Sequence, residues 1–181
     1  MPRNVEIKAR VADLASVREA ALRIGARFHA VEVQTDRYYT VDGAHRVKLR
    51  TIAGGRAELV EYWRSEATGV RASDYTITPV RDEAAGLCLV PKGQPRVVVR
   101  KRREILLWDN VRIHLDEVDG LGTFLELEAV VDERHDEPTC WAQVDMLMRA
   151  LALRDDELIR ASYAEMVDQN ASADSTGVTK A

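Results

Sequence analysis

Strict alternation between polar and apolar residues is the feature of this sequence that most constrains its fold. In the first such segment, residues 4–11, the polar or charged members are Asn4, Glu6, Lys8 and Arg10. Successive side chains of a β-strand point to opposite faces of the sheet, so these side chains would share one face. A carboxylate beside two cations suits a site for a metal ion and a phosphate group. An exposed edge strand produces the same alternation, and this segment alone leaves both interpretations open.

The same alternation recurs in residues 46–50, where every charged residue is a cation. Arg46, Lys48 and Arg50 alternate with apolar residues and would share one strand face. Cations on one face repel each other unless water solvates them or they converge on a polyanion. Arginine can bind phosphate oxygens through two parallel hydrogen bonds. The pattern is therefore compatible with a solvated face or with a polyphosphate site.

Two further predicted strands add cations. Residues 57–64 end in Arg64, and residues 96–107 contain four consecutive cations. Because neighbouring residues of a strand face opposite ways, one alternating pair of these cations must point inward. The two candidate pairs are Arg100 with Arg102 and Lys101 with Arg103.

Carboxylates appear in the last two predicted strands. The alternating polar residues there are Arg112, His114, Asp116, Glu126 and Glu128. If the sheet closes with its charged faces inward, one wall is basic and the other is acidic. Such an arrangement binds a polyphosphate that is bridged to a divalent metal by carboxylates. His114 could act as a base, but a histidine on a charged wall is more typical of a hydrogen-bonded neighbour.

The secondary-structure pattern predicts an α+β protein. Strands are expected at residues 4–11, 31–39, 46–52, 57–64, 75–80, 96–107, 110–117 and 123–131. Helices are expected at residues 13–25, 82–89 and 139–152, with another running through Leu158, Ile159, Tyr163, Met166 and Val167. These elements suit an eight-stranded antiparallel closed β-barrel with a charged interior and apolar outer faces covered by helices. We expect one domain at residues 1–168 and a disordered tail at residues 169–181.

Composition narrows the class of protein. With 46% hydrophobic residues, the 181-residue chain can form one well-buried domain. The net charge of -4 argues against a nucleic-acid partner. No apolar run approaches the roughly 18 residues needed to span a bilayer. We therefore expect no membrane partner and a cytoplasmic location.

The order of the motifs resembles that of the CYTH superfamily, the triphosphate tunnel metalloenzymes. Residues 4–8, Asn-Val-Glu-Ile-Lys, are similar to the family signature Glu-x-Glu-x-Lys, and residues 112–118, 120–122 and 124–128 are similar to its second half. The resemblance covers residues 2 to about 167 and is nearest to the class IV adenylyl cyclase-like bacterial branch. It implies a tunnel that binds ATP or another triphosphate with Mg²⁺ or Mn²⁺. It is also compatible with a homodimer.

The resemblance implies roles for individual residues. The metal side would consist of Glu6, Glu126 and Glu128, with Asp116 either a further ligand or a neighbour of the ligands. Phosphate oxygens would be held by Lys8, Lys48, Arg50, Arg64, Lys101 and Arg103. The family pattern Lys-x-Arg favours Lys101 and Arg103 as the inward pair. Catalysis would depend on Glu6, Lys8, Asp116 and Glu126.

Asn4 departs from the family signature, because it stands where the first glutamate is expected. A neutral amide can accept a hydrogen bond through its oxygen but brings no negative charge. We therefore expect weaker metal binding, or fewer bound metals, than in relatives with both acids.

Three functions are compatible with the sequence. The resemblance favours a cyclase-like reaction, in which the 3′-hydroxyl of ATP attacks the α-phosphorus and pyrophosphate leaves. The alternative is a triphosphatase that uses water on a nucleoside, thiamine or inorganic triphosphate. A non-catalytic polyphosphate or nucleotide sensor is the third, and the four retained carboxylates argue against it because a pure anion binder gains little from them.

Overall fold

The computed structural model describes residues 3–42, 45–63 and 71–176. Within these ranges the chain forms eight strands and four α-helices. The strands are β1 (Arg3–Arg10), β2 (Arg27–Asp42), β3 (His45–Ile52), β4 (Arg56–Trp63), β5 (Arg71–Val80), β6 (Val97–Trp108), β7 (Val111–Val118) and β8 (Gly122–Val131). The helices are α1 (Leu14–Arg23), α2 (Glu83–Leu87), α3 (Glu137–Ala150) and α4 (Tyr163–Thr176), with a short 3₁₀ turn, η1 (Asp155–Glu157), before α4.

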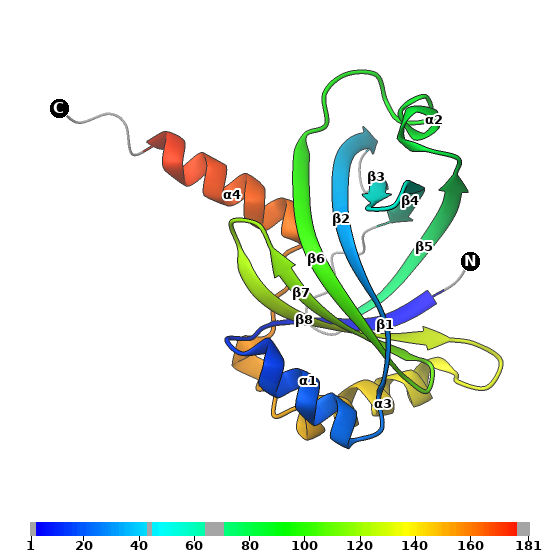
Figure 1. Cartoon of the computed structure of the whole chain (residues 1–181), viewed down its shortest axis with the longest axis vertical. Helices are drawn as coiled ribbons and strands as arrows, with labels where there is room; N and C mark the ends of the chain where they lie inside the picture. Colours follow the sequence, from blue (N-terminus) through cyan, green and yellow to red (C-terminus); the bar gives the residue numbers. More distant parts are fainter. Residues whose placement is uncertain (1–2, 43–44, 64–70, 177–181) are drawn as a thin grey trace.

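The strands form one closed antiparallel barrel. Their order is β1-β5-β4-β3-β2-β6-β7-β8, and the pairing of β8 with β1 closes the barrel. The long strands β2 and β6 pair with each other and join the β3–β4–β5 side of the molecule to the β7–β8–β1 side (Figure 1). The predicted α+β fold with an eight-stranded antiparallel barrel is confirmed.

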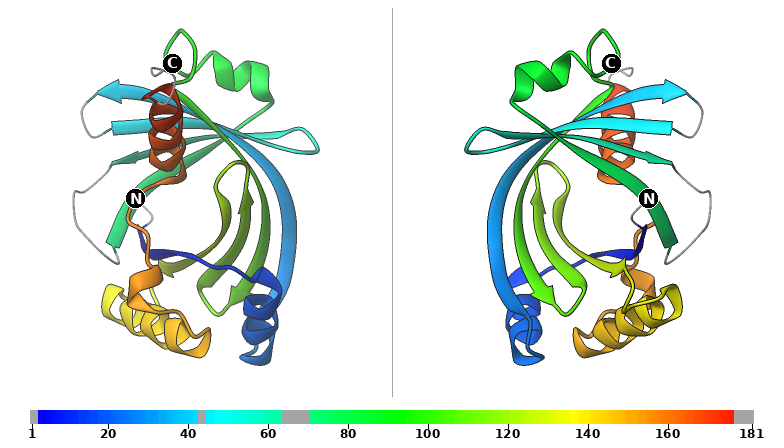
Figure 2. Two further views of the ribbon diagram at one scale, coloured as in Figure 1. Left: turned by 90° about the vertical axis from the view of Figure 1, so that its left-hand side faces the viewer. Right: turned by 90° about the vertical axis from the view of Figure 1, so that its right-hand side faces the viewer.

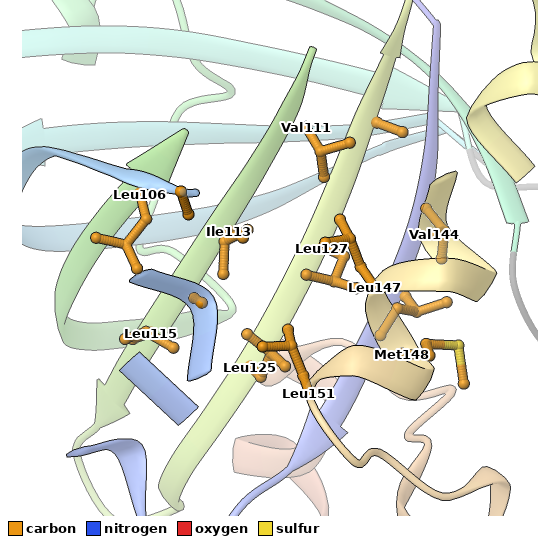
Figure 3. Packing of buried hydrophobic residues seen from close by; sticks show 14 of the residues in the cluster. Leu106, Val111, Ile113, Leu115, Leu125, Leu127, Val144, Leu147, Met148 and Leu151 are labelled. Carbon is orange, nitrogen blue, oxygen red and sulfur yellow. The ribbon is translucent and has the colours of Figure 1, made fainter. Parts of the chain in front are cut away.

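The main hydrophobic core lies outside the barrel, beneath α1 and α3 (Figures 2 and 3). Val144 and Leu147 of α3 are buried in one cluster with Ile113 of β7 and Leu127 of β8. Ala21 brings α1 into the same cluster. Because the apolar strand residues point outward into this core, the alternate polar residues must point into the barrel.

The helices begin at capped positions. The side chain of Asp13 accepts hydrogen bonds from the backbone N–H groups of Ala15 and Ser16, and Asp136 caps α3 through Thr139. These bonds satisfy backbone donors that have no partner inside a helix. None of the helices in the described ranges is long and apolar enough to cross a membrane.

The segment between η1 and α4 is not helical, although the sequence predicts a helix through Leu158 and Ile159. Leu158 bridges Ala9, and the Ile159 N–H donates to the carbonyl oxygen of Lys8 at 2.8 Å. β5 pairs only with residues 3–6 of β1, so the remaining edge of β1 needs another backbone partner, which this segment supplies. α4 then continues to Thr176.

Candidate functional site

β1 and β8 place the first predicted site residues on the barrel interior. The apolar residues of β1 belong to the outer core, so Asn4, Glu6 and Lys8 face inward. The strand register sets Glu6 opposite Glu128 and Lys8 opposite Glu126. Directly opposite residues of an antiparallel pair share a face. The structure therefore brings the glutamates of the sequence motifs together on one wall.

On β6 the inward pair is Lys101 and Arg103. Both residues are 4% exposed, whereas Arg100 and Arg102 are exposed on the outer surface. Arg102 forms an exposed ion pair with Glu117 at 3.1 Å. The interior pair is the one that the family pattern implies.

Asp116 is surrounded by cations and hydrogen-bond donors. Arg103 donates to its two oxygens through Nε at 2.7 Å and Nη2 at 2.6 Å, and the Tyr163 hydroxyl donates at 2.9 Å. Lys101 Nζ lies 3.7 Å away. Burial alone would raise the pKa of Asp116, but Arg103 and Lys101 hold it below its usual range. Asp116 is thus placed to orient Arg103 and Lys101.

Glu126 lies between the cations and the acidic wall. Its Oε1 is 3.2 Å from Lys8 Nζ, and Arg103 donates to its Oε2. Burial opposes the charge, but Lys8 and Arg103 hold the pKa of Glu126 well below its usual range. The carboxylate is therefore ionised at neutral pH and engaged by two residues that the sequence predicts to bind phosphate.

His114, Glu126 and Glu128 form a cluster that could hold a divalent metal. One ligand atom from each of the three residues lies within 4.8 Å of the others. Burial, reinforced by the nearby Arg103, lowers the pKa of His114, so its neutral imidazole keeps a nitrogen lone pair. Among the described residues the Nδ1 of His114 is buried and has no hydrogen-bond partner. Carboxylate oxygens suit Mg²⁺ or Mn²⁺, so this donor set fits the predicted metal. Asp116 is not part of this cluster within the described chain.

Asp36 is a buried site residue that the sequence analysis does not single out. Its side chain is 1% exposed and accepts hydrogen bonds from Arg50 at 2.7 and 2.9 Å and from Lys48 at 3.2 Å. Burial alone would raise the pKa of Asp36, but Arg50 and Lys48 hold it well below its usual range, with a further contribution from Lys101. Asp36 therefore neutralises much of the charge on the predicted phosphate-binding strand β3.

A CYTH domain model matches residues 2–163. The chain belongs to the CYTH family. Members of this family are metal-dependent and act on triphosphate substrates.

Individual relatives of this CYTH protein extend over nearly the whole chain. A Methanocaldococcus jannaschii protein named "Putative adenylate cyclase" is 27% identical over 177 residues, with 90% of this chain and 97% of the relative covered. The PH1012 protein from Pyrococcus horikoshii has a similar structure, with a TM-score of 0.78 and 23% identity. The match covers 90% of this chain and 98% of the PH1012 chain. A Hippeastrum protein gives a TM-score of 0.66 at 12% identity, and the match covers 94% of this chain and 96% of that protein. Its structure is described as revealing a dominant triphosphatase activity.

Asn4, which departs from the CYTH signature, contacts a cation. It is 3% exposed, and with its amide oriented to satisfy both ends, Oδ1 accepts from Arg112 Nη2 at 3.0 Å and Nδ2 donates to the Arg3 carbonyl oxygen at 3.2 Å. Arg112 also lies 3.1 Å from Glu128 Oε2 and donates to the Tyr75 hydroxyl at 3.1 Å. Asn4, which stands where the signature has a glutamate, thus helps to hold Arg112 against Glu128.

Tyr163, the first residue of α4, closes over the cations of the CYTH site. Its ring centroid is 4.1 Å from Lys8 Nζ and 5.1 Å from Lys101 Nζ, and the ring also packs against Phe124. Burial and the nearby carboxylates, Glu126 first, raise the pKa of Tyr163 well above its usual range, so its hydroxyl stays protonated and donates to Asp116. The ring therefore packs inside the barrel while Asp116 satisfies its hydroxyl.

The predicted phosphate ligand Arg64 lies outside the described residues. Two buried polar residues of β2, Gln34 and Asp36, were not predicted. Gln34 is 2% exposed and, like Asp36, belongs to the alternating polar residues of β2. The alternation that identifies β1 could have identified both of them, since Gln34 and Asp36 are two residues apart.

Proposed function

We propose that this CYTH protein is a metal-dependent enzyme that converts ATP to cyclic AMP and pyrophosphate inside the barrel. One observation carries the proposal. The interior holds a group of cations directly beside a cluster of potential metal ligands, and Glu126, a member of that cluster, contacts the cations Lys8 and Arg103. This juxtaposition suits a polyphosphate whose oxygens also contact a divalent metal.

The cations would bind and orient the triphosphate. Lys48 and Arg50 on β3 and Lys101 on β6 would exchange carboxylate partners for phosphate oxygens, whereas Arg103 would bind phosphate through the N–H groups that do not bond Asp116. Asp116 would keep the Arg103 guanidinium in one orientation through its two-point hydrogen bond. In phosphoryl transfer the protein acts mainly by positioning and by stabilising charge, and these residues supply both.

The acidic wall would hold the metal. Glu126 and Glu128 belong to the cluster of potential ligands, and Glu6 faces the same interior opposite Glu128, which supports this role. A bound divalent metal would polarise the reacting phosphoryl group and neutralise developing charge. The neighbouring cations would meanwhile stabilise the negative charge of the departing pyrophosphate.

A triphosphatase is the second candidate because it can use the same site with water as the nucleophile. The Hippeastrum relative, with the same fold, is described as having a dominant triphosphatase activity. A non-catalytic sensor is less well supported, since the buried Glu126 and Glu128 would weaken anion binding without serving it.

Product analysis tests the proposal. The purified protein would be incubated with ATP, or with tripolyphosphate, in the presence of Mg²⁺ or Mn²⁺, and the products would be separated by ion-exchange chromatography. We expect cyclic AMP and pyrophosphate in equal amounts from ATP. Release of orthophosphate instead would identify a triphosphatase, and metal-independent binding without turnover would identify a sensor.

Proton uptake by Lys101 gives a second test of the basic wall. Burial and the neighbouring Arg103 lower the pKa of Lys101 to about 7. Below that pH the ammonium is already charged, whereas above it the bound polyanion must draw a proton onto the side chain. Metal-free tripolyphosphate binding should therefore take up more protons at pH 8 than at pH 6 and weaken by up to about tenfold per pH unit above 7.

Calorimetry in two buffers of different ionisation enthalpy would measure this uptake. Lys101→Arg is the matched control because the guanidinium stays charged throughout this range. Titration of the tripolyphosphate itself contributes equally to both proteins. Equal proton uptake by the wild type and by Lys101→Arg would contradict the role given to Lys101.

A further inference from the structure

We propose that His114 is a nitrogen ligand of the metal centre and that it makes the centre select Mn²⁺ over Mg²⁺. The inference rests on the proposed function for the presence of a metal, and it adds a ligand that the glutamate signature does not contain. It begins with an imidazole nitrogen that has no partner.

The Nδ1 of His114 faces two carboxylates without bonding to either. It lies 3.6 Å from Oε1 of Glu128 and 3.8 Å from Oε2 of Glu126. Both distances exceed the about 3.2 Å limit of a good N–H···O hydrogen bond. They are shorter than the roughly 4.2 Å that two metal–ligand bonds of about 2.1 Å can span. A cation between these atoms would satisfy the His114 nitrogen and bind Oε1 of Glu128, and it would share Oε2 of Glu126 with Arg103.

The side chain is also held in this position by its strand. His114 is 4% exposed, and its neighbours along β7, Ile113 and Leu115, are buried in the outer core. The register of β7 against β8 sets His114 opposite Glu126. A buried polar nitrogen without a partner is costly, so its retention at a fixed position toward two carboxylates points to a ligand.

The surrounding charges leave this part of Glu128 open to a cation. Arg112 contacts Oε2 of Glu128 at 3.1 Å, whereas the His114 nitrogen faces Oε1. Asn4 supports Arg112 through its amide oxygen. Asn4 thus supplies no carboxylate, whereas His114 on β7 offers a nitrogen, so the donor set is mixed nitrogen and oxygen.

This donor set determines the preferred metal. Mg²⁺ favours oxygen ligands and retains water, whereas imidazole is a common ligand for transition metals. Affinity for a given nitrogen and oxygen site also increases along the first transition row from Mn²⁺. We expect Mn²⁺ to bind at least about tenfold more tightly than Mg²⁺, and removal of His114 to weaken Mn²⁺ binding by about 10- to 100-fold.

Pulsed electron paramagnetic resonance of Mn²⁺ bound to the full chain, without a triphosphate, tests the ligand directly. We expect nitrogen coupling in the wild type, and a change of that coupling when the histidines are labelled with ¹⁵N. His114→Gln should abolish the coupling, while Mg²⁺ affinity, measured by competition, should change by less than about threefold. If glutamine is not accommodated, His114→Asn serves, and the isotope comparison on the wild type needs no variant.

His135→Gln is the matched control. His135 also lies beside two carboxylates, 2.8 Å from Asp132 and 3.2 Å from Asp109, but outside the barrel site. The nitrogen coupling should be unchanged in this variant. Loss of coupling in His135→Gln but not in His114→Gln would overturn the inference, as would bound Mn²⁺ with no nitrogen coupling or a failure of Mn²⁺ to bind.

Metal binding and turnover can fail separately. Nitrogen coupling from His114 in a protein that converts no triphosphate would uphold this inference and contradict the proposed function. Turnover of a triphosphate by a protein whose bound Mn²⁺ shows no nitrogen coupling would uphold the proposed function and contradict this inference.

Discussion

Asp36→Asn is expected to lower the free energy of unfolding by about 3–5 kcal/mol, because it leaves Lys48 and Arg50 without their buried carboxylate. The Asp36 side chain is 1% exposed, and those of Lys48 and Arg50 are 15% and 12% exposed, so water can offset little of the loss. Urea denaturation followed by circular dichroism would measure the change. Tripolyphosphate should stabilise Asp36→Asn more than it stabilises the wild type, since the anion would neutralise the two freed cations.

The matched control is Asp145→Asn on α3. Asp145 pairs with Arg149, but both side chains are largely exposed, at 60% and 79%. Exposed pairs contribute little, so this variant should remain within about 0.5 kcal/mol of the wild type. If Asp36→Asn were as stable as Asp145→Asn, or gained no extra stability from tripolyphosphate, Asp36 would not be the counter-charge of a polyanion site.

The local pattern of the sequence is sufficient to predict the strands and to separate the two faces of β1. Strand periodicity depends only on adjacent residues, so it groups Asn4, Glu6 and Lys8 on one face, whereas the direction of that face follows only from the other strands of the barrel. On β6 the four consecutive cations obscure the period, and the family pattern was needed to choose Lys101 and Arg103. Burial in the structure agrees with that choice.

The pairing of charges could not be predicted in the same way, because it depends on strand register and barrel closure. Asp36 meets Arg50 only because β2 and β3 pair in one register, in which these residues are opposite. Asp116 and Glu126 are both acids of adjacent strands. Asp116 on β7 lies opposite Arg103 of β6, however, whereas Glu126 on β8 lies opposite His114 of β7. The sequence therefore groups them as metal carboxylates, whereas the structure gives Asp116 to the cations.

The metal side of the barrel leads to the largest expected loss of activity. Glu126→Gln should lower kcat/KM for the triphosphate by at least about 100-fold, because the amide keeps the shape of the side chain but loses the charge that a divalent metal requires. Glu126 also lies 3.2 Å from Lys8 and accepts from Arg103. Removing its charge frees both cations, so tripolyphosphate binding without metal should stay equal or become tighter.

Opposite effects on turnover and on metal-free binding would separate a metal ligand from a residue that merely supports the fold. Steady-state kinetics and calorimetry on the same preparation would measure the two quantities, with thermal unfolding as the check on folding. Glu117→Gln is the matched control, since Glu117 on β7 faces outward in an exposed pair with Arg102. It should leave both quantities unchanged. Full turnover by Glu126→Gln would show that Glu126 is not a metal ligand. A parallel loss of turnover and of metal-free binding would show that Glu126 supports the fold by holding Lys8 and Arg103 in place.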